Sequence, residues 1–113
     1  MVINQGEKVH FIRRRNFVDD LRRHFLGEVK EVDGQVVRVE GYVFIFDPSK
    51  CEYLKKVQKR TTIVNLGDSG YIVNIIPIDV NIEQLVYKRI KEKLVVTDDK
   101  SFSLDINEFG INR

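Results

Sequence analysis

Arginine and lysine are the residues whose types and spacing best fit a chemical role in this sequence. Seven basic residues against three acidic ones lie between positions 8 and 30, and five against one lie between positions 50 and 60. Such groups bind phosphate, and two basic stretches on one surface are typical of a nucleic-acid-binding face. The alternative is that they form the solvated outer faces of strands. The candidate nucleic-acid-binding residues here are Arg13, Arg14, Arg15, Arg22, Arg23, Lys55, Lys56, Lys59 and Arg60.

Three aromatic residues lie close to these basic stretches along the chain: Phe11, Phe17 and Tyr53. Aromatic rings beside cationic groups can stack on the bases of a single strand. The competing interpretation is that the same rings belong to the hydrophobic core of the domain.

Groups that could support catalysis or bind a metal are sparse. His10 and His24 lie in no nucleophile motif, and two histidines without a third ligand make an incomplete metal site. Cys51 is the only cysteine, so no disulfide can form within the chain. The pairs at 19–20 and 98–99 are adjacent aspartates, which point to opposite faces of a strand. We therefore expect no enzymatic activity, no metal site and no cofactor.

The length and composition indicate one soluble globular domain of residues 1–113. Hydrophobic residues make up 42% of the chain and the charges are mixed, which argues against disorder. No apolar run approaches the roughly 20 residues that span a bilayer, and the first six residues lack a signal-peptide core. With the lone cysteine, these features predict a cytoplasmic protein without membrane contact.

A β-hairpin is the clearest element of the first half of the chain. Residues 8–12 favour a strand. The segment that follows fits either a short helical turn capped by Asn16 or a full helix over 17–24. Residues 25–30 alternate as a strand, and Asp33-Gly34 predicts a tight type I′ turn. The chain returns over 35–46, where residues 42–46 are apolar on both faces. This segment must be covered by the rest of the chain or by a second subunit.

Short strands and turns also fill the second half. Residues 47–50 form a turn, 67–70 are a second hairpin signal, and the strand at 71–76 is ended by Pro77. Residues 85–90 and 94–97 favour strands, although 81–92 also has helical spacing. Many short strands with glycine-containing turns predict a mainly β fold that forms a closed or nearly closed small barrel. A barrel also solves the edge problem that a flat sheet of this length would create.

The hairpin resembles the first signature of Sm-like proteins. That signature has glycine, an aliphatic residue two positions later and aspartate four positions after that, which Gly27, Val29 and Asp33 satisfy. Gly67 resembles the glycine of the second signature. Val37 stands where the family has asparagine, and Leu66 where it has arginine or lysine.

This resemblance implies a strongly bent five-stranded barrel of the Sm-like or SH3-like type over residues 8–78. Residues 79–113 would then form a C-terminal β extension. Family members assemble into rings by edge pairing and commonly bind RNA, which adds Asp33 and Gly67 to the candidate nucleic-acid-binding residues. Because two base-contacting residue types are replaced, the first hypothesis is a non-enzymatic module for self-association or protein interaction. The alternative is an RNA- or single-strand-binding ring.

Overall fold

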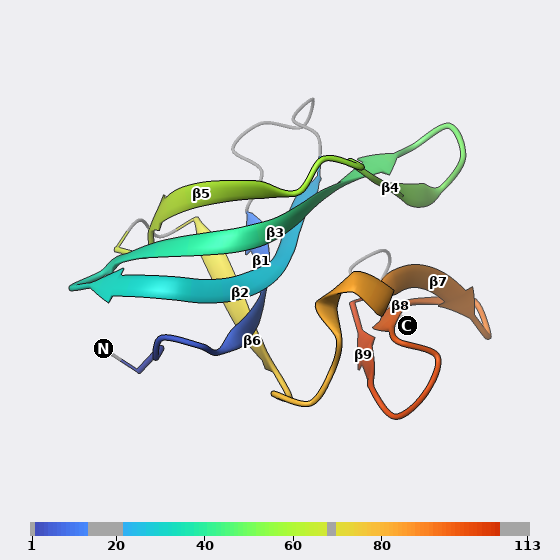
Figure 1. Ribbon diagram of the computed structural model, residues 1–113. Coiled ribbons are helices and arrows are strands. Elements are labelled where there is room, and N and C mark those ends of the chain that lie inside the picture. The colour runs from blue at the N-terminus through green and yellow to red at the C-terminus, as the bar shows by residue number, and fades with distance from the viewer. Residues whose placement is uncertain (1, 14–21, 68–69, 107–113) are drawn as a thin grey trace. The chain divides into compact units, whose positions relative to one another are not determined.

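The computed structural model describes residues 2–13, 22–67 and 70–106, and Figure 1 shows the strands that they form. Two compact units, Met1–Ile78 and Asp79–Arg113, divide the chain. The described residues form nine strands, all paired antiparallel, in two sheets. The expectation of a mainly β fold is therefore confirmed, whereas the expected count of five strands is wrong.

The first unit contains a six-stranded sheet. Its strands are β1 (Lys8–Arg13), β2 (Arg23–Asp33), β3 (Val36–Asp47), β4 (Glu52–Lys55), β5 (Arg60–Asn65) and β6 (Tyr71–Ile76). The order is β4-β3-β2-β1-β6, and β5 also pairs with β3. The long strand β3 pairs with β5 along its first half and with β4 along its second half.

The sheet does not close into the barrel that the sequence predicted. Closure would require β5 and β6 to pair, but β5 pairs with β3 and β6 pairs with β1. Two edges therefore stay open within the described sheet. Hydrophobic alternation specifies which face of a strand is buried, and it carries no information on whether the outermost strands meet.

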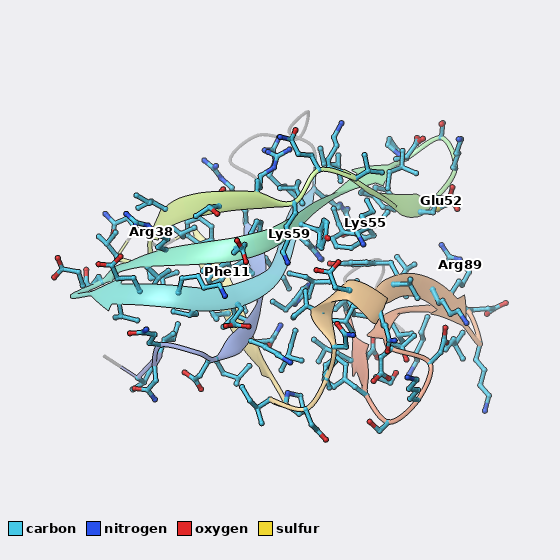
Figure 2. All side chains as sticks on the ribbon, viewed as in Figure 1. Phe11, Arg38, Glu52, Lys55, Lys59 and Arg89 are labelled. Carbon is cyan, nitrogen blue, oxygen red and sulfur yellow. The ribbon has the colours of Figure 1, made fainter. Side chains whose placement is uncertain are left out.

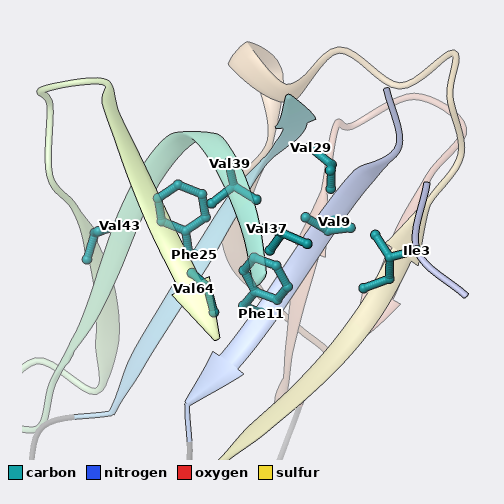
Figure 3. Packing of buried hydrophobic residues seen from close by; sticks show 9 residues of the cluster. All are labelled: Ile3, Val9, Phe11, Phe25, Val29, Val37, Val39, Val43 and Val64. Carbon is teal, nitrogen blue, oxygen red and sulfur yellow. The ribbon is translucent and has the colours of Figure 1, made fainter. Parts of the chain in front are cut away.

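One face of the six-stranded sheet holds the hydrophobic core of the unit, and we call it the core face. Alternate residues of β1, β2, β3 and β5 point to it, as the alternation in the sequence predicted for residues 25–29 and 37–43. Figure 3 shows the packed side chains, which are Ile3, Val9, Phe11, Phe25, Val29, Val37, Val39, Val43 and Val64.

The opposite face, which we call the reverse face, is also apolar along the second half of β3. Tyr42, Phe44 and Phe46 are all buried. Tyr53 on β4 packs against Phe46 with ring centroids 5.2 Å apart. The prediction that residues 42–46 would be covered on both faces is confirmed, and β4 supplies part of the cover.

Two glycines face each other where β2 and β3 run closest. Gly27 pairs with Gly41. A Cβ atom at Gly27 would lie 2.5 Å from the carbonyl oxygen of Glu40, and one at Gly41 would overlap the carbonyl oxygen of Leu26. Both positions therefore require glycine because the backbones approach too closely for a side chain.

The hairpin turn between β2 and β3 differs from the predicted type. Asp33 pairs with Val36, so the two turn residues are Gly34 and Gln35 rather than Asp33 and Gly34. Only Gly34 has a positive φ, +60°. This is the pattern of a type II′ turn, which needs glycine at its first central position alone.

The second hairpin signal, at residues 67–70, does not join two paired strands. β5 before it and β6 after it pair with different partners. Glycine-rich segments mark a change of chain direction, but they do not dictate which strands then become neighbours.

The second unit is a three-stranded sheet. β7 (Val86–Ile90), β8 (Lys93–Thr97) and β9 (Ser103–Asp105) follow one another in space as in sequence. The segment 81–92 contains one short 3₁₀ turn, Ile82–Gln84, capped by the Asn81 side chain, followed by strand β7 and the turn at 91–92. The preference for strand over a long helix is thus confirmed. No helix in the described ranges is long and apolar enough to span a membrane.

Candidate functional site

Three of the predicted basic residues converge on the core face. Arg13 and Arg23 are direct partners across β1 and β2, and they continue the row in which Phe11 faces Phe25. Arg60 begins β5 and shares its face with Thr62 and Val64. The strand registers thus bring together arginines that lie 10 and 37 positions apart in the sequence.

These arginines surround a pocket of about 220 Å³ within the first unit. At roughly 30 Å³ per water, it has room for about seven water molecules. Its apolar wall includes Phe11, Phe25, Val43 and Val64, which belong to the hydrophobic core. Arg13, Arg23, Arg60, Thr62 and Tyr71 contribute the polar groups, with His24 completing the lining.

The charge of the pocket is not balanced by the described protein groups. Within the part of the chain that the structure describes, Arg13, Arg23 and Arg60 form no ion pair. Arg13 and Arg23 also carry like charges on directly opposite positions of neighbouring strands, an arrangement that destabilises a sheet. The pocket is therefore a concentration of positive charge above an apolar wall.

Three other described basic candidates, Arg22, Lys55 and Lys59, do not line this pocket. The Lys55 ammonium lies 4.0 Å from the centre of the Tyr42 ring, and Arg22 lies 5.6 Å from that of Phe46. The Lys59 ammonium is 3.9 Å from a carboxylate oxygen of Glu40, on the reverse face. Figure 2 labels Lys55 and Lys59 on this part of the sheet.

Of the other sequence candidates, Lys56 is exposed, and Arg14 and Arg15 lie outside the described residues. The two described aromatics near the basic stretches do not present free stacking faces. Phe11 is 2% exposed and part of the core, and Tyr53 packs against Phe46 and His24. Phe17 also lies outside the described residues.

Asp33 and Gly67, the signature residues counted among the binding candidates, lie near the hairpin turn. Asp33 pairs with Val36, whereas Arg23 pairs with Ile45, nine residues further along β3. At about 3.3 Å per residue this places them roughly 30 Å apart. Asp33 borders a separate hollow with Glu31 and Arg38, which are ion-paired at 3.0 Å.

At the other signature positions, Val37 is fully buried and the Gly67 N–H donates to the Asn65 side chain at 2.9 Å. Asp33 and Gly67 therefore do not line the pocket of the three converging arginines.

Both histidines belong to a chain of hydrogen bonds between side chains on the reverse face, running from Asn74 to Tyr53. Asn74 Nδ2 lies 3.2 Å from His10 Nδ1, His10 Nε2 lies 3.1 Å from His24 Nδ1, and His24 Nε2 lies 3.2 Å from the Tyr53 hydroxyl. One set of protons satisfies this chain: Asn74 donates to His10, His10 donates to His24, and His24 donates to Tyr53.

Burial lowers the pKa of His10 to about 4. Burial, followed by the charges of His10 and Arg22, lowers that of His24 to about 3. Both imidazoles are therefore neutral at pH 7.

No metal site forms around these histidines. Their facing nitrogens bond to each other, and the described residues contain no cluster of three or more His, Cys, Asp or Glu side chains arranged to hold an ion. Cys51 is exposed in the turn before β4.

The open edges of the sheet carry exposed isoleucines. Ile72 on β6 is 57% exposed and Ile75 is 50% exposed, and Ile63 on β5 is 63% exposed. β6 contains no charged residue. Within the described sheet, each of these strands has a partner on one side only.

Comparisons of the chain with protein-family models, with curated proteins and with solved structures found no match. The resemblance to Sm-like proteins stays a prediction based on the residues that carry it.

Two polar residues of the pocket, Thr62 and Tyr71, were not predicted from the sequence. The alternation of β5 could have placed Thr62 beside Arg60, since residues two apart share a face. Nothing in the sequence places Tyr71 beside them, because it becomes the partner of Arg13 only through the pairing of β1 with β6.

Proposed function

We propose that this protein is a non-enzymatic self-association module of the Sm-like type, in which β5 of one copy pairs with β6 of the next. The observation that carries the proposal is β6 itself. It is a six-residue strand without charge, paired on one side in the described sheet, with two isoleucines at least half exposed.

The composition of β6 supports pairing because the usual protection of an edge strand is missing. Edge strands commonly carry lysine, proline or a bulge that blocks another strand. The register between β1 and β6 is regular, and Tyr71–Ile76 contains neither lysine nor proline. An uncharged, regular, partly apolar edge is a ready template for a strand from another copy.

The two open edges favour a head-to-tail arrangement. β5 and β6 lie on opposite sides of the β3-β2-β1 path, so a contact between them joins different surfaces of two copies. Such heterologous contacts form a ring when the rotation closes. Both strands offer β-branched residues, which pack well across a sheet.

Sedimentation of the full chain tests this proposal through Ile72→Lys. The wild type is expected to sediment as an oligomer, and the variant is expected to sediment as a monomer because a charge on the edge opposes pairing. Val57→Lys is the matched control, since Val57 is 90% exposed and lies between β4 and β5 rather than on β6. A monomeric wild type at high concentration contradicts the proposal, as does equal dissociation in both variants.

Binding of single-stranded nucleic acid is the second candidate function, and the convergence of Arg13, Arg23 and Arg60 favours it. Phosphate attraction is strongest at low salt. The test is a fluorescence titration with U-rich and A-rich RNA at low salt, and binding that weakens as salt is added supports this candidate. Absence of binding under those conditions rejects this candidate.

A further inference from the structure

We propose that the arginine-lined pocket of the first unit is a binding site for a small organic anion. The oxyanion group, a phosphate monoester or a carboxylate, is held by Arg13, Arg23 and Arg60, and an aromatic ring attached to it enters the apolar part of the pocket. The proposal goes beyond edge pairing. Arg60, Thr62 and Val64 of β5 and Tyr71 of β6 line the pocket, whereas the exposed edge residues Ile63 and Ile72 do not.

The three guanidinium groups explain the anion. The N–H groups of a guanidinium match the geometry of phosphate and carboxylate oxygens. Charge-assisted hydrogen bonds of this kind are among the strongest hydrogen bonds in proteins. Arg13 and Arg23 face each other at a cost in stability that an anion between them would offset. Arg13, Arg23 and Arg60 form no ion pair with a carboxylate of the described residues.

The wall of the pocket explains the aromatic ring. Phe11, Phe25, Val43 and Val64 present apolar surface at a site whose rim is charged. A fully hydrated inorganic ion gains no binding free energy from that apolar surface. An aromatic ring that packs against the surface removes it from water, which favours binding. Thr62 and Tyr71 add side-chain hydroxyls that can hydrogen-bond a substituent on the ring. Few polar groups around an apolar wall are typical of small-molecule sites.

The arrangement favours a compact anion over a nucleic-acid strand. Surfaces that bind single strands combine a basic groove with several exposed stacking rings. Here Phe11 and Phe25 are at most 8% exposed, so they border a small cavity instead of forming a stacking platform. Other predicted basic residues, Lys55 and Lys59, contact Tyr42 and Glu40 on the reverse face.

The experiment is a titration of the ¹⁵N-labelled full chain with phenyl phosphate, inorganic phosphate and phenol, followed by NMR. Phenyl phosphate is expected to bind at least about tenfold more tightly than either of its parts and to shift the Arg13, Arg23, Arg60 and Thr62 signals. Equal affinity for phenyl phosphate and inorganic phosphate overturns the proposal, since it indicates general attraction of ions only.

Single variants test the role of the arginines. Arg13→Gln, Arg23→Gln and Arg60→Gln are each expected to weaken phenyl phosphate binding by about tenfold or more, as for a lost hydrogen bond to a charged group. Arg38→Gln removes the same charge from the reverse face, near the hairpin turn, and is the matched control. A loss of affinity in Arg38→Gln equal to that in the pocket variants overturns the proposal.

Two further readouts separate the pocket from its alternatives. Arg13→Gln is expected to raise the Tm of the ligand-free protein, because it relieves the repulsion with Arg23. A lower Tm instead indicates that Arg13 supports the fold and contradicts a ligand role.

A ten-nucleotide U-rich RNA is expected to bind no more tightly than phenyl phosphate. Much tighter RNA binding that the pocket variants abolish assigns the site to nucleic acid and rejects the small-anion proposal.

Discussion

At the scale of single residues, the histidines are the groups whose chemistry depends most on their surroundings. Each imidazole uses one nitrogen as donor and the other as acceptor in the chain from Asn74 to Tyr53. A proton added to His10 Nδ1 would face the Asn74 amide, and one added to His24 Nδ1 would face the N–H of His10. Protonation therefore replaces two hydrogen bonds by contacts between donors, in addition to the cost of burying a charge.

The stability of the protein is expected to fall on acidification through this chain. The folded-state pKa values, about 4 for His10 and about 3 for His24, lie below the ordinary value of 6.5. The unfolded state therefore binds more protons below pH 6.5, and stability present above that pH is lost as the pH falls towards 4 and 3. For His10 the full loss is roughly 3 kcal/mol, at about 1.4 kcal/mol per pKa unit.

Denaturant unfolding between pH 7 and pH 5 measures this effect, because most carboxylates titrate below that window. His24→Gln removes one titrating group, so it is expected to reduce the pH dependence by about half even if its stability at pH 7 is lower. A free energy of unfolding that is constant from pH 7 to pH 5 in the wild type would contradict the lowered pKa values.

At the scale of elements, the turns show where the local sequence and the backbone conformation disagree. Ile90 pairs with Lys93, so Lys91 and Glu92 form a two-residue turn. Both have positive φ, 51° and 68°. This is the dihedral pattern of a type I′ turn, for which asparagine and glycine are the favoured residues. Neither residue of this turn is of the favoured type.

We expect Lys91→Asn combined with Glu92→Gly to stabilise the β7–β8 hairpin by about 1 kcal/mol, because left-handed backbone costs non-glycine residues roughly 1–2 kcal/mol. Amide hydrogen exchange of residues 86–90 measures the gain, as slower exchange. Gly34→Ala, in the β2–β3 hairpin, is the opposite control and is expected to destabilise that hairpin. A Cβ at Gly34 meets no atom within 4 Å, so only its φ of +60° opposes alanine. Faster exchange in the double variant would show that the turn is not under this constraint.

At the scale of the whole molecule, self-association links stability to concentration. A partner that binds only the folded state raises the Tm as its concentration rises. Calorimetry over a hundredfold range of protein concentration is therefore expected to show a rising Tm for the wild type and for Val57→Lys. Ile72→Lys is expected to have a constant Tm. A wild-type Tm that does not change with concentration argues against pairing through β6.

Much of the core could be predicted because burial in a sheet has a period of two. The positions of Val37, Val39 and Val43 follow from alternation alone, and so does the double burial of residues 42–46. The turn at Gly34 was predicted one residue early, since its type depends on the register of β2 with β3. The expected closure of the barrel and the second hairpin were wrong because strand pairing is a long-range choice.

The sequence by itself determined which residues of 25–29 and 37–43 face inward, to within one residue where the first hairpin turns, and that Arg13, Arg23 and Arg60 are cationic. Only the tertiary structure decided that these three arginines share a pocket and that β5 and β6 are left open. The physical reason is that alternation and turn chemistry act between residues a few positions apart. Sheet neighbours are instead chosen by backbone hydrogen bonds and packing between distant segments, such as β1 with β6.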